Sequence, residues 1–369
     1  MKKLIIISLL VLLFLGVLLL VFSNGDKNKD DNVVVSTTIP EDTNVVPKGS
    51  RVLGIDITEG SNTDYGASFL IAKDLGAEVV QLSFGWDDIE ASPEVYKNEF
   101  LSITNSFYPS YGSSVALVVS PIDTNVNRLP QDLKDKPLND PEVIARFNKL
   151  LDYIFSEIPD LQISSLSIGN EIDVYLGTDS ENWVEYQEFF KETSDHAKSL
   201  RPGLKVGSKA TFEGYTTQPK KDYLLSLNKN TDLLMVTYYP INSDFTMKDP
   251  SVVSPDFDNL ISIYPNKEIR FLEAGYSSGS VVDSSEQKQA EFIKQVMQSW
   301  DKHRGQITLI NFVWLHDLPQ SKVNDYSKYY GIGSNKFGEY LRTLGLRTYK
   351  GKDKLAMEFL KQALENRGW

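Results

Sequence analysis

An apolar run opens the chain. Residues 4–22 are apolar except for Ser8 and Gly16, and Lys2 and Lys3 precede them. In a helix, these 19 residues would rise about 28 Å, close to the hydrocarbon thickness of a bilayer. The two lysines favour a cytoplasmic N-terminus and place the rest of the chain outside. We predict a transmembrane anchor at the cell membrane over residues 1–23. The alternative is a cleaved signal peptide, which would leave the domain secreted.

A polar stretch follows the apolar run. Residues 24–49 are rich in short polar side chains and contain Pro40 and Pro47, but they show no helical periodicity. This composition is typical of flexible linkers. We therefore predict a tether over residues 24–49 and one folded domain over residues 50–369.

From Arg51 onwards, short apolar runs alternate with longer amphipathic segments. In residues 142–157, and similarly in 184–200, apolar side chains recur at helical spacing. Strands that alternate with helices predict a parallel sheet with right-handed crossovers. Eight strands fit a (β/α)8 TIM barrel better than an open doubly wound sheet, and no G-x-G-x-x-G follows the first run. The predicted strands are 52–58, 79–85, 115–121, 163–169, 205–211, 233–239, 269–273 and 307–314.

Composition narrows the classes of function. The roughly 320 residues of the domain suit one large core. A net charge of -12 repels phosphate backbones, so we expect no nucleic-acid partner. The absence of Cys excludes disulfides, thiolate zinc sites, cysteine nucleophiles and a lipidated cysteine, and the three His form no HExxH pair. We expect neither a metal nor an organic cofactor.

Two predicted strands end in a glutamate. Glu171 follows the fourth strand and Glu273 ends the seventh. In such barrels the active site lies at the carboxyl ends of the strands. A pair of carboxyl groups about 5–5.5 Å apart is what retaining glycoside hydrolysis uses, one as acid/base and one as nucleophile. A single glutamate at a strand end is as readily explained by an ion pair with a neighbour such as Arg270. Two of them favour catalysis.

These residues belong to a wider set of motifs. The set resembles the clan A retaining glycoside hydrolases, in particular the endo-galactanase-like and mannanase-like branches, and covers most of the domain. Its motifs are Gly169-Asn170-Glu171, the lone Glu273, the stretch from Trp86 through Ile89-Glu90 to Tyr96, Tyr238-Tyr239-Pro240, Trp314 on the eighth strand, and residues 345–356 before the last helix.

The resemblance implies a role for each matching residue. Glu171 would be the general acid/base and Glu273 the nucleophile. Asn170 would hydrogen-bond the sugar 2-hydroxyl, Tyr239 would orient Glu273, and Trp314 would stack against the sugar in the cleavage subsite, which its strand position favours over the alternative of core packing. One position departs from the family. Gln81 stands where many members carry an arginine that keeps the nucleophile ionised, so Glu273 lacks one source of pKa depression.

Other polar and aromatic residues fall at the predicted mouth. Trp86 and Tyr276 are candidates for outlying sugar subsites, and Gln81 is counted with the substrate-binding residues. The remaining candidates, each as readily an ordinary loop residue, are Asp56, Asp123, Glu213 and His316.

Two other classes of function compete with the hydrolase. Lys209 lies in an apolar strand, as the Schiff-base lysine of a barrel aldolase does, but the loops after strands seven and eight offer no basic phosphate site. An ion pair with an acid, or an outward-pointing side chain, explains Lys209 better. A barrel that binds surface glycans without cleaving them is the second hypothesis, prompted by Gln81. We predict a retaining hydrolase with a carbohydrate substrate; the sequence specifies neither the sugar nor the oligomeric state.

Overall fold

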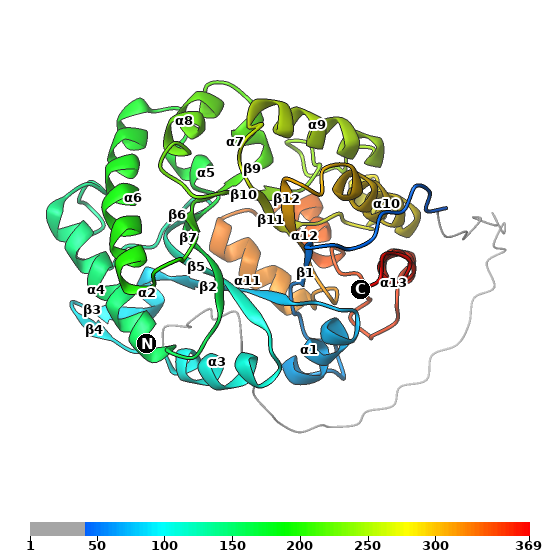
Figure 1. The fold of residues 1–369 in the computed structure, drawn as a ribbon, viewed down its shortest axis with the longest axis horizontal. Helices are drawn as coiled ribbons and strands as arrows, with labels where there is room; N and C mark the ends of the chain where they lie inside the picture. The colour runs from blue at the N-terminus through cyan, green and yellow to red at the C-terminus, as the bar shows by residue number, and fades with distance from the viewer. Residues whose placement is uncertain (1–40) are drawn as a thin grey trace.

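The computed structural model describes residues 41–369 (Figure 1). The predicted anchor or signal over residues 1–23 lies outside this range, as does most of the predicted tether. Within residues 41–369, no helix has both the length and the apolar character needed to cross a membrane.

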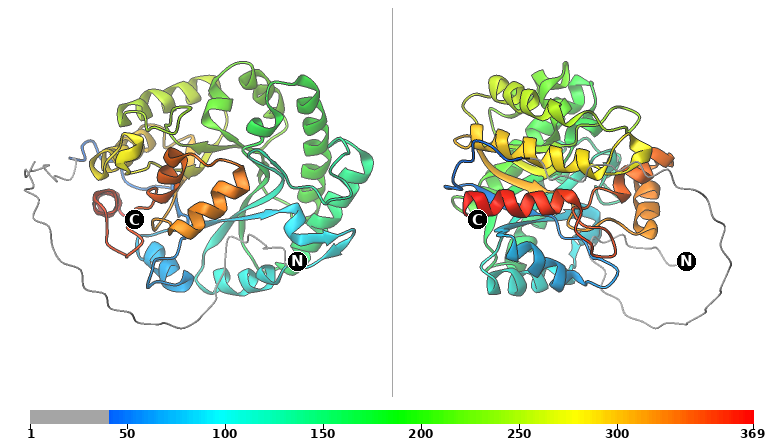
Figure 2. Two further views of the ribbon diagram at one scale, coloured as in Figure 1. Left: turned by 180° about the vertical axis from the view of Figure 1, so that it is seen from behind. Right: turned by 90° about the vertical axis from the view of Figure 1, so that its right-hand side faces the viewer.

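A ring of parallel strands forms the centre of the domain (Figures 1 and 2). Neighbours pair in the order β8-β7-β5-β2-β1-β12-β11-β10-β9. Residues 206–211 complete the ring, because β8 pairs with β7 and β9 with β10. Since Ser208 merely separates β8 from β9, residues 41–369 provide eight barrel strands in nine pieces, which confirms the predicted α/β barrel. The pieces are β1 (Val52–Ile55), β2 (Val79–Gly85), β5 (Ser114–Asp123), β7 (Ile163–Asn170), β8 (Val206–Gly207), β9 (Lys209–Thr211), β10 (Leu234–Tyr238), β11 (Ile269–Ala274) and β12 (Ile307–Phe312).

Helices surround the ring and connect its strands. The predicted helices over 142–157 and 184–200 correspond to α4 and α6, whose apolar faces pack against the barrel. Three short strands lie outside the ring pattern: β3 (Glu90–Ser92), β4 (Val95–Tyr96) and β6 (Val126–Asn127). The α-helices are α1 (Tyr65–Asp74), α2 (Trp86–Ile89), α3 (Glu99–Ser110), α4 (Pro141–Glu157), α5 (Ile172–Leu176), α6 (Ser180–Leu200), α7 (Phe212–Thr216), α8 (Lys220–Leu227), α9 (Val253–Ile263), α10 (Glu286–Lys302), α11 (Gln320–Tyr330), α12 (Asn335–Arg342) and α13 (Leu355–Arg367), with 3-10 turns η1 (Pro250–Val252) and η2 (Ser280–Val282).

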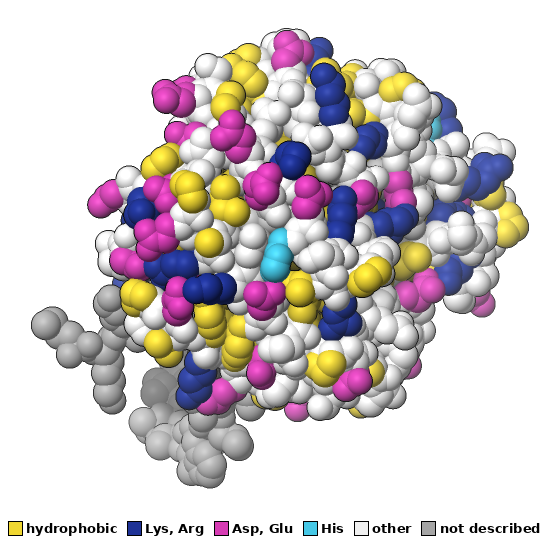
Figure 3. All heavy atoms as spheres, turned by 60° about the vertical axis from the view of Figure 1, so that its left-hand side comes forward, with side chains coloured by type: hydrophobic (Ala, Val, Ile, Leu, Met, Phe, Trp, Pro, Cys, Tyr) yellow, Lys and Arg dark blue, Asp and Glu magenta, His cyan; other side chains and the backbone are white. Residues whose placement is uncertain are grey.

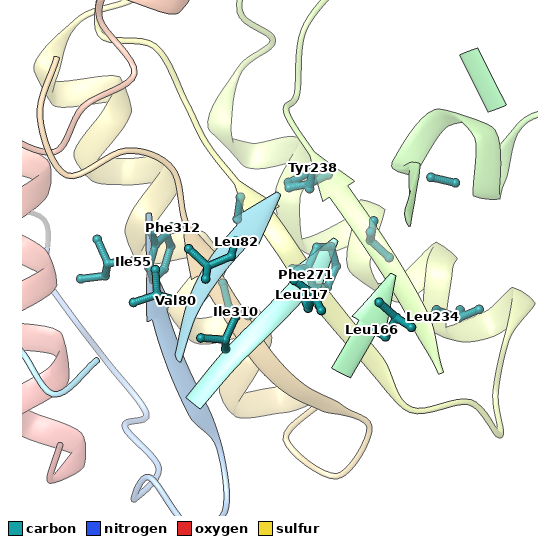
Figure 4. Close-up of a cluster of buried hydrophobic side chains, with 14 of the residues drawn as sticks. Ile55, Val80, Leu82, Leu117, Leu166, Leu234, Tyr238, Phe271, Ile310 and Phe312 are labelled. Atoms are coloured by element: carbon teal, nitrogen blue, oxygen red, sulfur yellow. The ribbon is translucent and has the colours of Figure 1, made fainter. Parts of the chain in front are cut away.

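Alternation along the strands separates two apolar layers. The larger lies between strands and helices, and Figure 4 shows part of it, including Leu117, Leu166 and Phe271. The smaller contains residues that alternate with these, such as Ala116 and Leu272. Since neighbouring strand residues face opposite sides, the smaller layer fills the inside of the ring. The positions beyond it on the same inner face are free to carry polar side chains.

The ordered domain begins earlier than predicted. Lys48 donates its backbone N–H to the Arg367 carbonyl, and Arg367 forms an ion pair with Asp42 at 2.5 Å. Arg51 donates to the carbonyls of residues 46 and 47. The prediction of a flexible tether up to residue 49 is therefore wrong for its last part, which packs against α13. Composition alone did not reveal this, because the contacts are made by the far end of the chain.

This N-terminal segment meets a buried ionic cluster. Asp301 accepts from Arg51 and from Arg367, both at 2.6 Å, and all three side chains are nearly inaccessible. Asp301→Ala would leave two buried guanidinium groups short of a counter-charge, so we expect the free energy of unfolding to fall by about 3–5 kcal/mol, as measured by urea denaturation.

A surface ion pair provides the control for this prediction. The face shown in Figure 3 carries basic and acidic side chains side by side, with apolar side chains in small separate patches. Exposed pairs of this kind contribute little to stability. Glu192→Ala, which removes one acidic partner of Lys191 on α6 and leaves Asp195 as another, should leave the urea midpoint unchanged. An equal effect of the two substitutions would contradict the assigned role of Asp301.

Candidate active site

The local backbone after β7 aims Glu171 at the barrel mouth. Gly169 has φ +86°, and a Cβ there would lie 2.5 Å from the Ile172 side chain, so only glycine fits. Glu171 itself has φ 42° and occupies the N-cap position of α5. Left-handed backbone at a residue other than glycine is concentrated at functional sites. The motif Gly169-Asn170-Glu171 is thus a sharp turn that ends the strand and presents the glutamate.

Two hydroxyl groups hold the Glu171 carboxyl group. Thr237 on β10 donates to Oε1 at 2.7 Å, and Thr124 after β5 donates to Oε2 at 2.9 Å. Burial and, next, the negative charge of Glu273 raise the pKa of Glu171 to about 7. Glu171 therefore holds its proton up to about pH 7, well above an ordinary carboxyl group, as a general acid requires.

A β-bulge directs Glu273 into the same mouth. Strict alternation would place Glu273 on the face of Phe271, and that face packs against the helices. In the structure, Val236 pairs with Phe271 but the next residue, Thr237, pairs with Glu273, so Leu272 is skipped. The bulge thereby turns Leu272 and Glu273 towards the inside of the ring. Bulges are frequent beside active sites for this reason.

Three donors surround the Glu273 carboxylate. Lys209 donates to Oε1 at 2.5 Å and Gln81 to the same oxygen at 3.3 Å, while the Tyr239 hydroxyl donates to Oε2 at 2.7 Å. Burial by itself would raise the pKa of Glu273, but the charge of Lys209 and these hydrogen bonds outweigh it and lower the pKa below its usual range. Arg270, the alternative ion-pair partner, contacts Glu268 instead.

The two glutamates belong to one site. Thr237 pairs in register with Glu273, yet its hydroxyl group donates to Glu171. Each carboxyl group therefore lies beside the same residue of β10. Their environments differ, since Glu171 contacts neutral hydroxyl groups whereas Glu273 contacts a cation. The arrangement pairs a protonated acid with an ionised carboxylate.

Further polar groups complete the mouth. Asn170 Nδ2 donates to Asp123 at 2.7 Å, and within the described part of the chain its buried Oδ1 has no hydrogen-bond partner. Asp56 accepts from Asn311 at 2.7 Å, and burial followed by the charge of Glu273 raises its pKa to about 7. Asp56 and Asp123 were each expected to be either a sugar-binding residue or an ordinary loop carboxylate. Both line the site.

Trp314 and two helices cover one side of the mouth. Trp314 is half-buried and stacks on Tyr326 of α11 with ring centroids 5.9 Å apart, so at most one indole face is available to a sugar. Figure 2, left, shows α11 lying across the end of the barrel. Tyr329 of α11 donates to Asp123 at 2.6 Å, and the α12 ring Tyr340 packs against Tyr239. Sequence periodicity did not predict α11 or α12.

Several candidates lie away from the mouth. Trp86 is completely buried against Phe147 and donates to Glu90 at 2.6 Å, so the predicted sugar subsite there is wrong. Tyr276 is also buried, and its hydroxyl group donates to the Lys248 carbonyl, which excludes it as a subsite too. His316 is a buried loop partner of Thr58, and Glu213 is exposed on α7.

Two hydroxyl groups of the site were missed. Alternation could have indicated Thr237, which lies two residues before Tyr239 and therefore on the same face of its strand. Nothing in the sequence marks Thr124, which has φ 53° in a turn after β5. In residues 41–369, no cluster of three or more His, Asp or Glu side chains has a geometry suited to a metal ion.

No protein-family model and no curated protein matches the sequence. Solved structures do match in three dimensions. A GH5_18 structure from Streptomyces cattleya with GlcNAc has a TM-score of 0.63 at 13% identity over 87% of this chain and 80% of its own. The exo-beta-1,4-mannosidase of Opitutaceae bacterium strain TAV5 has a TM-score of 0.64 at 14% identity, over 85% of this chain and 59% of its own. Xylanase 10B from Thermotoga maritima has a TM-score of 0.63 at 14% identity, over 86% of this chain and 95% of its own. The chain therefore has the barrel fold of these structures, which agrees with the resemblance to clan A glycoside hydrolases.

Proposed function

We propose that the domain is a retaining glycoside hydrolase with Glu273 as nucleophile and Glu171 as acid/base. The observation that carries this proposal is the opposite environment of two glutamates in one mouth. Glu273 forms an ion pair with Lys209 and has a lowered pKa, whereas burial and the charge of Glu273 raise the pKa of Glu171 to about 7. Two carboxyl groups with separated pKa values are what double displacement at an anomeric carbon requires.

The first step forms a covalent intermediate. A carboxylate oxygen of Glu273 attacks the anomeric carbon while the bond from that carbon to the glycosidic oxygen breaks. Glu171 gives its proton to that oxygen, so the leaving group departs as an alcohol. The sugar is then an ester of Glu273, and Glu171 is an anion that Thr237 and Thr124 stabilise by donating to it.

The second step reverses these roles. Glu171 removes a proton from a water molecule, whose oxygen attacks the anomeric carbon and displaces Glu273 as a carboxylate. Two inversions give net retention. Asn170 Oδ1 is buried without a partner in the described residues, which supports a role for it in accepting a hydrogen bond from a sugar hydroxyl.

We infer a neutral, β-linked glycan as substrate. Asp56 and Asp123 line the mouth together with the two glutamates, and this collection of carboxyl groups disfavours uronic acids. The names of the structural neighbours, an exo-beta-1,4-mannosidase and a xylanase, support β-1,4-linked mannan or xylan as the first substrates to test.

The test is hydrolysis by the purified full-length protein. β-1,4-mannan, β-1,4-xylan and β-1,4-galactan, with the corresponding aryl β-glycosides, form the panel, and ¹H NMR identifies the first anomer released. We expect the β-anomer to appear first. An α-anomer would overturn the double-displacement mechanism. Binding of a glycan in affinity electrophoresis without any hydrolysis would support a non-catalytic barrel.

The pH dependence follows from the two carboxyl groups. Glu273 must be ionised, so kcat/KM falls as pH drops through its lowered pKa. Glu171 must be protonated, so kcat/KM also falls as pH rises through about 7. We expect a bell-shaped profile with its alkaline limb near neutrality. A 2,4-dinitrophenyl glycoside, which needs no acid assistance, should lose this limb. A profile for the natural linkage that still rises at about pH 9 would contradict the assignment of Glu171.

We also infer that the domain acts outside the cytoplasm. The support is the apolar run 4–22 behind Lys2 and Lys3, which predicts an exported chain. Protease added to intact cells should digest the domain, and the mass of the cellular protein will show whether residues 1–23 are retained as an anchor. Full protection in intact cells with digestion after lysis would place the domain inside.

A further inference from the structure

We propose that Lys209 is a positioning residue that keeps Glu273 ionised and fixes the orientation of its carboxylate. This inference rests on the proposed function, because it assigns a role in preparing the nucleophile. The sequence alone allows Lys209 to be an aldolase Schiff-base lysine, or a side chain that pairs with an acid or points outward. The structure shows the ion pair.

Lys209 lies two strands from Glu273 in the ring, because β10 separates β9 from β11. It begins β9 and pairs in register with Met235 of β10, whose side chain belongs to the inner apolar layer. The Lys209 side chain is 1% exposed, and its Nζ lies 2.5 Å from Glu273 Oε1. Its backbone N–H donates to the hydroxyl group of Ser167 on β7, and Ser167 and Ser165 of that strand are small and fully buried. The aliphatic stem therefore passes through the barrel interior rather than outward.

Lys209 acts on Glu273 through two contacts. It is the one cation among the described residues that forms an ion pair with this carboxylate. It also donates to Gln81 Oε1 at 3.0 Å, and this bond turns Gln81 Nε2 towards Glu273 at 3.3 Å. The other donor, Tyr239, is neutral. Without Lys209, the carboxylate would keep only neutral partners, and one of these would lose the bond that orients it.

A fixed positive charge beside the Glu273 carboxylate serves two purposes. A carboxylate withdrawn from water regains a proton unless an opposite charge lies close to it. A nucleophile must also approach the anomeric carbon along a defined direction. Lys209 and Gln81 occupy Oε1, while Tyr239 holds Oε2. Both carboxylate oxygens are therefore hydrogen-bonded before substrate binds, with the charged donor Lys209 at Oε1.

The test is the variant Lys209→Met, which keeps the length of the side chain and removes its charge. ¹³C NMR of the glutamate carboxyl carbons, assigned with Glu273→Gln, reports the pKa of Glu273 in the full chain without any substrate. We expect this pKa to rise by about one unit or more. On a glycoside that the wild type hydrolyses, the acid limb of the pH profile should move upward. At the pH optimum, kcat should fall about 10²- to 10³-fold with KM little changed.

Lys354→Met is the matched control. Lys354 is 3% exposed and lies 2.6 Å from Asp317, an ion pair of similar burial to the one that Lys209 forms with Glu273. Its loss should lower stability but leave both the Glu273 pKa and the acid limb unchanged. If the Lys209 variant does not fold, Lys209→Gln provides the same loss of charge with a polar head group.

An unchanged Glu273 pKa in the folded Lys209 variant would overturn this proposal. So would equal shifts in the Lys209 and Lys354 variants, because general loosening of the barrel would then be the cause. Failure of the wild type to hydrolyse any glycan would count against the proposed function alone, since the NMR readout needs no substrate.

Discussion

Glu273→Gln is expected to lower kcat by about 10⁴-fold or more. The substitution keeps the shape of the side chain but leaves no anion to attack the anomeric carbon. It also removes the negative partner of Lys209, whose Nζ is buried 2.5 Å away. The rate is measured by the release of aryl alcohol from the best glycoside of the panel. Because the buried lysine becomes unpaired, we also expect a lower melting temperature, which circular dichroism will record.

Glu213→Gln is the control for this loss. Glu213 follows the fifth barrel strand on α7 and is exposed, so its substitution changes one carboxyl group outside the Glu171–Glu273 pair. It should retain wild-type kcat within about a factor of two. A Glu273→Gln protein that is folded and still hydrolyses glycosides at a substantial fraction of the wild-type rate would refute the nucleophile assignment.

The positions of the barrel strands could be predicted because each strand is a short, nearly continuous apolar run in the sequence. Their continuous apolar runs define the register of the ring, and strict alternation correctly places Ser165 and Ser167 of β7 opposite Leu166, which belongs to the outer core. The same rule failed at Glu273. There a β-bulge lets two successive residues face inward, and such an insertion depends on the pairing with β10 rather than on β11 itself.

The partners within the site were harder to predict than its carboxyl groups. Lys209 and Glu273 are 64 residues apart in the sequence, and their ion pair depends on how the two strands that flank β10 direct their side chains inside the ring. In the sequence, Gln81 stands where related proteins carry an arginine, and Lys209 has no evident partner. In the structure, Lys209 supplies the positive charge beside Glu273 that Gln81 cannot supply. Burial of aromatic rings is equally non-local, which is why Trp86 and Tyr276 were wrongly placed at the mouth.

Glu171→Ala should produce a loss that depends on the leaving group. For a glycan or an unactivated glycoside, kcat/KM should fall about 10²- to 10⁴-fold, because no acid protonates the departing oxygen. For a 2,4-dinitrophenyl glycoside, whose leaving group needs no proton, formation of the glycosyl ester at Glu273 should stay close to the wild-type rate. Hydrolysis of that ester then becomes slow, since no base activates water. The measurement is pre-steady-state release of dinitrophenol, where we expect a burst.

Azide distinguishes the acid/base from a residue that only shapes the site. It is a nucleophile that needs no general base, and alanine leaves room for it where the carboxyl group stood between Thr237 and Thr124. Azide should therefore accelerate turnover of the Glu171→Ala protein and yield a β-glycosyl azide. The wild type, whose Glu171 is an anion at this stage, should show no such acceleration. If the variant lost activity equally on activated and unactivated substrates and azide restored nothing, Glu171 would be structural, and the proton would have to come from another group of the mouth, of which Asp56 with a pKa of about 7 is the nearest in character.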